Sequence, residues 1–136
     1  MSVNLKQNVA ERARYCCEYC RSQEAFSPAA FSVEHITPHA RGGNDEIENL
    51  AYACQECNNR KFTSVEASDP VSGESVPLYH PRQHTWSEHF AWNEDYTLLI
   101  GLTPTGRATI ERLKLNRDRV VNLRDALRQI GRHPLK

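Results

Sequence analysis

The sequence predicts a small α+β fold, and three observations lead to that prediction. One short segment, residues 31–36, alternates apolar and polar residues as a strand does, and several longer segments repeat apolar residues at helical spacing. Two cysteine pairs of equal spacing lie on either side of the predicted strands. The 136 residues fit one domain, and their apolar fraction of 39% lies below the average of roughly 45–50% for globular proteins. An added staple would therefore help a core of this size.

The N-terminal half is predicted to contain two strands with a helix on either side. Leu5, Val9 and Ala13 recur every four residues, as on one face of a helix. Thr37 and Pro38 end the first strand, and a flexible turn follows. The predicted elements are a helix over residues 4–15, a loop over residues 21–31, strands over residues 31–36 and 49–53, and a helix over residues 54–64.

The C-terminal half is predicted to contain a hairpin followed by two helices. Thr103 and Pro104 give the cap and first turn of one helix, Asn116 is expected to cap the next, and Gly131 is expected to stop it. The remaining predictions are a turn-rich loop over residues 69–74, strands over residues 85–92 and 96–101, a turn over residues 93–95, and a last helix with Val120, Leu123, Leu127 and Ile130 on its apolar face.

The formal net charge is zero, but the charge is distributed unevenly. Residues 1–22 carry a net +2, residues 23–106 a net −8 and residues 107–136 a net +6. A basic tail is typical of a phosphate-binding face and equally typical of a solvated helix surface, so both interpretations stay open. The arginines that would form such a face are Arg117, Arg119, Arg124, Arg128 and Arg132.

The N-terminal residues are polar, and no long apolar run follows them. We therefore expect neither a signal peptide nor a transmembrane helix, no membrane partner, and a cytoplasmic protein. In a reducing compartment, cysteines are more often metal ligands or free thiols than disulfides.

Four of the five cysteines form matched pairs, Cys17-x-x-Cys20 and Cys54-x-x-Cys57. Each pair can form a knuckle that directs two thiolates at one ion, and two knuckles complete a tetrahedral structural zinc (Zn²⁺) site. The alternatives are a redox pair or two disulfides, but the thioredoxin-like context of a redox pair is missing. Cys16 is left over as a spare thiol.

A second pattern lies between and beside these pairs. Glu34 and His35 lie on the first predicted strand, Asn49 starts the second, and Asn58 lies on the helix after it. In this order and spacing, residues 14–62 resemble the HNH endonuclease family. That family has an acidic residue and a histidine on a strand, a central asparagine, and a final histidine or asparagine on a helix. The resemblance implies a ββα-metal (His-Me finger) core with structural zinc and flanking N- and C-terminal helices.

The same resemblance implies a single HNH nuclease domain over residues 1–136. Its core would span about residues 14–64, and a C-terminal hairpin and helical extension would span about residues 78–131. The implied activity is metal-dependent endonucleolytic hydrolysis of phosphodiester bonds in DNA, with double-stranded DNA as the expected partner. A protein partner stays open, and no base-reading motif is present.

The family pattern assigns a role to each matched residue. By this resemblance His35 is the general base that activates water, since an imidazole with an ordinary pKa of about 6.5 accepts protons near neutral pH. Glu34 and Asn58 would bind a catalytic Mg²⁺ or Mn²⁺ through hard oxygen ligands. Asn49 would hydrogen-bond the backbone of the loop between the strands and hold His35 in place.

Two departures and one geometric question concern these residues. The family more often has aspartate before the histidine, where this chain has Glu34, and position 58 is asparagine instead of histidine. Glu34 and His35 are adjacent, so they point to opposite faces of a regular strand and serve one site only if the strand ends or bends there. Pro38 and the glycine-rich loop after it permit such a bend.

Other residues near the motif have two interpretations each. Arg41, Arg60 and Lys61 are candidates for nucleic-acid binding through phosphate contacts, and the alternative is solvated surface charge. His39 is a loop histidine or a residue that assists the metal or the phosphate. The aromatic stretch over residues 86–92 closes a small core or stacks on bases.

Two rival classes of protein stay open. One is a non-catalytic zinc-knuckle module that binds nucleic acid or protein, and the other is a zinc-dependent regulatory protein. The in-register set of Glu34, His35, Asn49 and Asn58 favours the enzyme, because a binding knuckle has no need of a metal-binding carboxylate beside a histidine.

Overall fold

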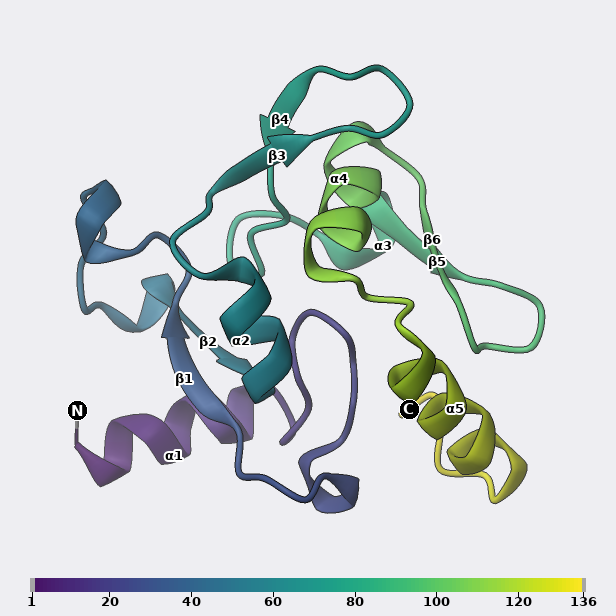
Figure 1. Ribbon diagram of the computed structural model, residues 1–136. Coiled ribbons are helices and arrows are strands. Elements are labelled where there is room, and N and C mark those ends of the chain that lie inside the picture. Colours follow the sequence, from purple (N-terminus) through teal and green to yellow (C-terminus); the bar gives the residue numbers. More distant parts are fainter. Residues whose placement is uncertain (1, 136) are drawn as a thin grey trace. The chain divides into compact units, whose positions relative to one another are not determined.

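The computed structural model describes residues 2–135, and it confirms the predicted mixture of helices and small antiparallel sheets (Figure 1). Its α-helices are α1 (Val3–Arg12), α2 (Gln55–Lys61), α3 (Trp86–His89), α4 (Pro104–Leu113) and α5 (Asp118–Gln129). Its strands are β1 (Ser32–His35), β2 (Leu50–Ala53), β3 (Glu66–Ser68), β4 (Ser75–Pro77), β5 (Phe90–Trp92) and β6 (Leu99–Gly101). Its short 3-10 helices are η1 (Glu24–Phe26), η2 (His39–Arg41) and η3 (Ile47–Asn49).

These elements form two compact units. The first comprises Met1–Val65 and His80–His84, and the second comprises Glu66–Tyr79 and Thr85–Lys136. The first unit therefore holds both cysteine pairs and all the motif residues, while the organisation of the whole chain as one nuclease domain stays a prediction. No helix in residues 2–135 is both long and apolar enough to cross a membrane.

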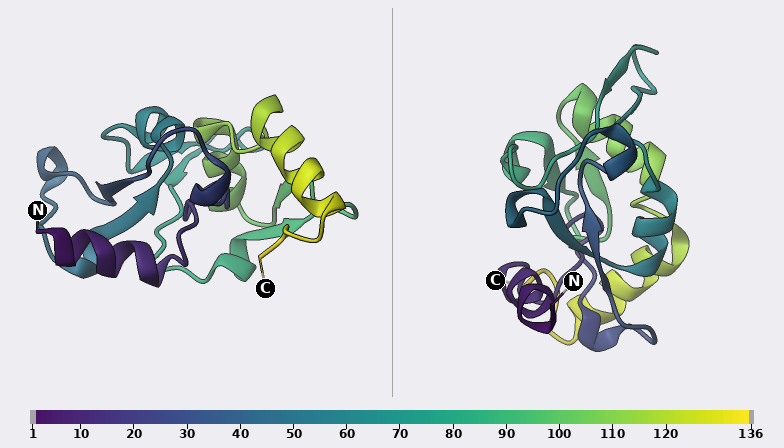
Figure 2. Two further views of the ribbon diagram at one scale, coloured as in Figure 1. Left: turned by 90° about the horizontal axis from the view of Figure 1, so that it is seen from below. Right: turned by 90° about the vertical axis from the view of Figure 1, so that its left-hand side faces the viewer.

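In the first unit, β1 and β2 form an antiparallel hairpin with His35 opposite Leu50. All four residues of β2 are buried, and α1 packs alongside this strand (Figure 2). The guanidinium of Arg12, in the last turn of α1, donates hydrogen bonds to the backbone carbonyls of Ile47 and Leu50. These bonds tie α1 to the start of β2, and the two strands predicted on either side of the motif loop are confirmed.

Helix α2 follows β2 with only one residue between them. That residue, Cys54, caps the helix through its sulfur, which accepts a hydrogen bond from the backbone of Cys57. The helix ends at Lys61, because the next residue, Phe62, has a φ of 49° that is incompatible with a further helical turn. The short helix predicted after the second strand is thus confirmed, although it ends before residue 64.

The second unit contains a hairpin that the sequence did not indicate. Strands β3 and β4 pair around the predicted turn over residues 69–74. Buried Asp69 organises this turn, because its carboxylate accepts hydrogen bonds from the backbone of Val71 and Ser72 and from the guanidinium of Arg107. Each strand has three residues, which is too short for an alternating pattern to stand out.

The prediction of one strand over residues 85–92 is wrong in its first half. Trp86–His89 forms the single-turn helix α3, and only the last three residues form β5. The helical turn brings the ring of Trp86 to 5.7 Å from that of Phe90, which is buried and also lies 5.1 Å from the ring of Tyr79. The aromatic stretch therefore closes a small core, which is one of its two interpretations.

The two C-terminal helices start differently from one another. Thr103 caps α4 as predicted, because its hydroxyl accepts a hydrogen bond from the backbone of Gly106 at 3.0 Å. The predicted cap of α5 is wrong, since Arg117 occupies that position. The side chain of Asn116 instead accepts a hydrogen bond from the N–H of Leu99 and donates one to its carbonyl, at the start of β6.

Arg124 is not part of an exposed basic face on α5. Its side chain is buried, with 2% of the residue exposed, and donates to the backbone carbonyls of Thr97 at 2.9 Å and Leu115 at 2.7 Å. Its guanidinium also lies 5.1 Å from the centre of the Trp92 ring, a distance at which cation and ring attract each other. The exposed basic face predicted for α5 therefore lacks Arg124.

We expect Arg124→Gln to lower the free energy of unfolding of the second unit by about 2–4 kcal/mol, because buried carbonyls lose a charged donor. Arg119 is exposed on the same helix, so Arg119→Gln is the control and is expected to change that energy by less than about 0.5 kcal/mol. Both tryptophans lie in the second unit, and urea unfolding followed by their fluorescence measures the effect. Equal effects of the two substitutions would contradict the burial of Arg124.

Candidate functional site

The four paired cysteines converge in the first unit. The Sγ atoms of Cys17, Cys20, Cys54 and Cys57 all lie within 4.8 Å of one another, and all four residues are buried. Thiolates at about 2.3 Å from a tetrahedral zinc ion lie about 3.8 Å apart, and the Sγ atoms of Cys20 and Cys54 are 3.8 Å apart. The cysteines form no disulfide. This donor set fits zinc, as the spacing predicted.

Both knuckles also donate backbone hydrogen bonds to sulfur. The N–H of Cys20 lies 3.4 Å from Cys17 Sγ, and the N–H of Cys57 lies 3.4 Å from Cys54 Sγ. Burial raises the pKa of the Cys17 thiol, whereas hydrogen bonding from Cys17 lowers the pKa of the Cys20 thiol. The cluster therefore holds its protons unequally, and a dication would replace them.

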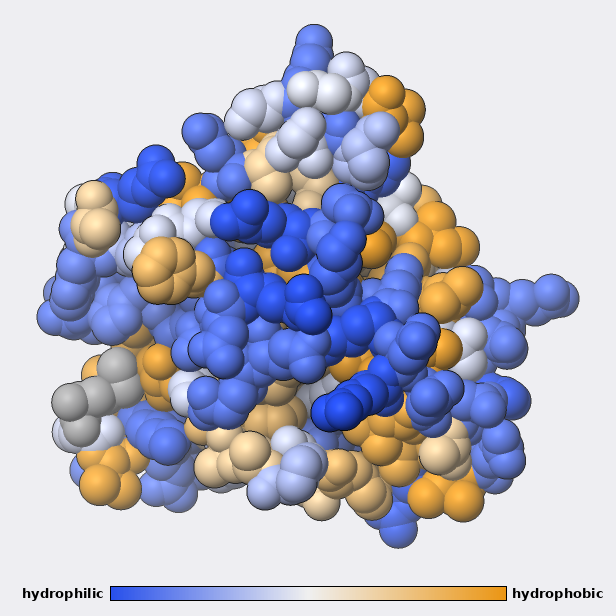
Figure 3. Space-filling model, in the orientation of Figure 1, coloured by the Kyte–Doolittle hydropathy of each residue, from blue (hydrophilic) through white to orange (hydrophobic). Residues whose placement is uncertain are grey.

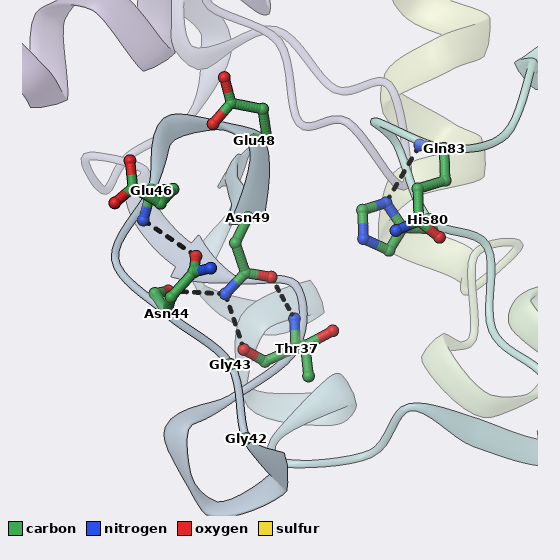
Figure 4. A pocket seen from close by; sticks show the side chains of 9 residues that line it. All are labelled: Thr37, Gly42, Gly43, Asn44, Glu46, Glu48, Asn49, His80 and Gln83. Atoms are coloured by element: carbon green, nitrogen blue, oxygen red, sulfur yellow. Dashed lines mark hydrogen bonds between the residues drawn. The ribbon is translucent and has the colours of Figure 1, made fainter.

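The side chain of Asn49 holds the loop between β1 and β2. Its Oδ1 accepts from the N–H of Thr37 at 2.8 Å, and its Nδ2 donates to the carbonyls of Thr37 at 2.8 Å and Asn44 at 2.7 Å (Figure 4). Gly43 is needed in this loop, since a Cβ there would lie 1.7 Å from the Thr37 carbonyl oxygen. Asn49 therefore makes the backbone hydrogen bonds expected of the central asparagine.

His35 lies at the end of β1, with 28% of its side chain exposed. Its Nε2 lies 2.7 Å from Oδ1 of Asp45, and Nε2 of His39 lies 2.7 Å from the same oxygen. Hydrogen bonding from His35 and His39 lowers the pKa of the Asp45 carboxyl. Asp45 was not predicted as a site residue, because it stands in a polar run of loop residues with no distinguishing spacing.

Glu34 occupies the other face of β1, as strand alternation requires. It is 4% exposed; its Oε1 accepts from the hydroxyl of Tyr19, and its Oε2 lies 3.4 Å from Nζ of Lys61. Burial raises the pKa of Glu34, and Lys61 opposes that shift. Lys61 is 1% exposed and also donates to the carbonyl of Ile36 at 2.7 Å. The structure thus does not bring Glu34 beside His35, and it directs the Lys61 ammonium inward.

The remaining predicted site residues lie at or near the surface. Asn58 is half-buried on α2, and no hydrogen bond among the described residues joins its side chain to Glu34 or His35. Arg41 and Arg60 are exposed, and Arg60 pairs with a glutamate one turn earlier on α2 at 2.9 Å. Hydrophilic residues dominate the surface over α2 in Figure 3. This surface is therefore polar, with one of its arginines already paired.

A segment distant in sequence, His80–His84, belongs to the same unit. The guanidinium of Arg82 pairs with Glu18, whose other oxygen accepts from the backbone N–H of Tyr52 at 2.8 Å. Sequence reasoning missed this contact, because its partners are 64 residues apart along the chain and Glu18 occupies an unspecified position of the first cysteine pair. Glu18, in the first knuckle, therefore contacts both β2 and the segment His80–His84.

The motif loop and the distant segment line a pocket of about 350 Å³ (Figure 4). Glu46 and Glu48 line it from the loop, and His80 and Gln83 line it from the segment. Burial lowers the pKa of His80, whose Nδ1 accepts from the backbone N–H of Gln83. Two carboxylates and a weakly basic histidine make this pocket unfavourable for a phosphate.

We expect Cys57→Ser to lose zinc and the cooperative unfolding of the first unit, because zinc binding supplies folding free energy in such sites. Cys16→Ser is the matched control, since Cys16 is also buried but lies outside the cluster. Zinc content by atomic emission and thermal melts by circular dichroism provide the readouts. The same zinc content in both variants would rule out the proposed ligand set.

We expect Lys61→Met to lower the free energy of unfolding by about 3–5 kcal/mol, because Glu34 is left as an uncompensated buried charge. The double substitution Glu34→Gln with Lys61→Met should recover much of this loss. Arg60→Met changes an exposed neighbour and is expected to cost less than about 1 kcal/mol. Chemical denaturation at neutral pH measures all three, and an unaffected Lys61→Met variant would argue against the buried pair.

The comparison with protein families agrees with the motifs. The HNH endonuclease family model matches residues 17–63, which include both cysteine pairs and the loop held by Asn49. No match was found among curated proteins or among solved structures. Residues 17–63 are therefore identified as an HNH endonuclease region, with the four-cysteine cluster inside it.

Proposed function

We propose that this chain is a metal-dependent endonuclease that hydrolyses phosphodiester bonds of DNA, with His35 as its general base. One observation carries the proposal: a partly exposed histidine lies at the end of β1 inside the region matched to the HNH family, on a loop that Asn49 holds. Strands β1 and β2 and helix α2 follow in the order of a ββα-metal core, and we propose that they form one.

Asp45 would set the position of the proton on the His35 ring. A neutral imidazole has one N–H and one lone pair. With Nε2 donating to Asp45 at 2.7 Å, the lone pair lies on Nδ1. Nδ1 then takes a proton from water as the water oxygen bonds to phosphorus, and the carboxylate stabilises the resulting imidazolium. The bond from phosphorus to the 3′ oxygen breaks and that oxygen takes a proton from solvent water, which leaves 5′-phosphate and 3′-hydroxyl ends.

Asn49 and the cysteine knuckles would act on His35 indirectly. The hydrogen bonds of Asn49 fix the loop immediately after His35. The knuckle at Cys54 fixes the start of α2, and the loop and helix then hold their positions without rearranging during the reaction.

Glu34 and Asn58 are the proposed ligands of a catalytic Mg²⁺ or Mn²⁺. The carboxylate of Glu34 and the amide oxygen of Asn58 suit a hard cation. When bound, such a cation polarises the phosphate and neutralises charge on the leaving oxygen. Both oxygens of Glu34 already have partners, Tyr19 and Lys61, so Lys61 must give way before Glu34 can act as a ligand. Glu34 also lies on the face of β1 opposite His35, so the proposed cation site requires a rearrangement of this buried pair.

The expected substrate is double-stranded DNA, and the proposed phosphate contacts are Arg41 and Arg60, which are exposed. Lys61 is buried, so we propose that its role is to balance Glu34 instead of contacting DNA. The acidic lining of the pocket at Glu46 and Glu48 disfavours a phosphate inside that pocket.

Incubation of the zinc-loaded chain with supercoiled plasmid and Mg²⁺ or Mn²⁺ tests the proposal. We expect cleavage that EDTA abolishes and that His35→Ala slows at least about 100-fold, the usual contribution of a general base. Asn49→Ala should slow it by about 10-fold or more, because the loop is no longer held. His84→Ala changes another histidine of the first unit, outside the loop, and should leave cleavage unchanged.

The same assay separates the enzyme from its main rival. A folded, zinc-loaded chain that shifts DNA in a gel but cuts it with no divalent ion would overturn the proposal. That result would favour a non-catalytic zinc-knuckle module.

A further inference from the structure

Two imidazoles and a carboxylate converge on the motif loop, apart from the four cysteines. One ligand atom each from His35, His39 and Asp45 lies within 4.8 Å of the other two. Asp45 Oδ1 lies 2.7 Å from Nε2 of both histidines, and the two rings are 4.6 Å apart. These three atoms lie close enough together to act as ligands of one metal ion.

The backbone that carries these three residues is held by the loop. His39 starts the short helix η2, which ends at Gly42 with a φ of 87°, a conformation that favours glycine. Asn49 bonds the backbone on both sides of this helix, at Thr37 and Asn44. The two histidines and Asp45 therefore lie on backbone that is held in place.

The donor chemistry indicates which ions would bind. Imidazole nitrogens suit zinc, nickel, cobalt and copper far better than Mg²⁺, which prefers oxygen ligands. Ligand bonds of about 2.0–2.2 Å at tetrahedral angles place neighbouring ligand atoms about 3.3–3.6 Å apart. The present separations of 2.7 Å therefore need to open by about 0.6–0.9 Å, which a small rotation of the exposed side chains provides. Three protein ligands on an exposed loop also leave positions for water.

We propose that His35, His39 and Asp45 form a second zinc site and that zinc bound there inhibits the nuclease. The metal site stands on its own, whereas the inhibition rests on the proposed function. Neutral imidazole has a single lone pair. Zinc at Nε2 of His35 takes that lone pair and moves the ring proton to Nδ1, so Nδ1 becomes a donor and no longer accepts a proton from water.

Binding is tested on full-length protein whose four-cysteine site is already filled with one zinc per chain. Further zinc is titrated while the imidazole ¹⁵N shifts are followed by NMR, and the affinity is measured by calorimetry. We expect one more zinc, with shifts at Nε2 of His35 and His39. His39→Gln and Asp45→Asn should weaken this step at least 10-fold. Glu46→Gln, which removes the neighbouring exposed carboxylate, should leave it unchanged.

Uptake of no second zinc, or equal affinity in His39→Gln and the wild type, would overturn the metal site.

The inhibition is tested by plasmid cleavage in Mg²⁺ with added zinc. Wild type should lose activity as the second site fills, and His39→Gln should remain active at the same zinc concentration. Zinc binding without loss of cleavage would overturn the inhibitory role alone. A chain that binds the second zinc but never cuts DNA would overturn the proposed function and leave the metal site standing.

Discussion

The convergence of four cysteine sulfurs is the interaction on which the first unit depends. It joins the knuckle that follows α1 to the knuckle that begins α2, so the β1–β2 hairpin between them has both ends fixed. The sulfur of Cys54 serves this cluster and caps α2 at once. A modest apolar core does not have to set the position of the motif loop by packing alone.

Within that frame, the two faces of β1 have separate tasks. Glu34 lies on the inner face, where Tyr19 and Lys61 satisfy its two oxygens. His35 lies on the outer face, where Asp45 receives its N–H and solvent reaches the ring. A buried ion pair of this kind contributes little net stability but penalises any arrangement that separates the charges, so it fixes the register of strand against helix.

The features that the sequence predicted are those set by local spacing. The cysteine pairs indicated their own cluster, alternation indicated β1, and the backbone hydrogen bonds of Asn49 followed from the family motif. One prediction that failed is local, since Trp86–His89 forms a helical turn where a strand was expected. The others concern partners far apart in sequence or charges that turn inward. Arg124 and Lys61 have the composition of surface residues, and only tertiary packing decides that they are buried. Asp45 likewise acquires its place from the loop conformation, which no residue pattern specifies.

The most direct measurement is a crystal structure of the zinc-loaded chain bound to a DNA duplex with a non-hydrolysable linkage. The account predicts that Nδ1 of His35 lies within hydrogen-bond distance of a water molecule in line with the blocked phosphate, while Nε2 keeps its bond to Asp45. DNA bound on a surface that leaves the His35 ring remote from every phosphate would contradict the account.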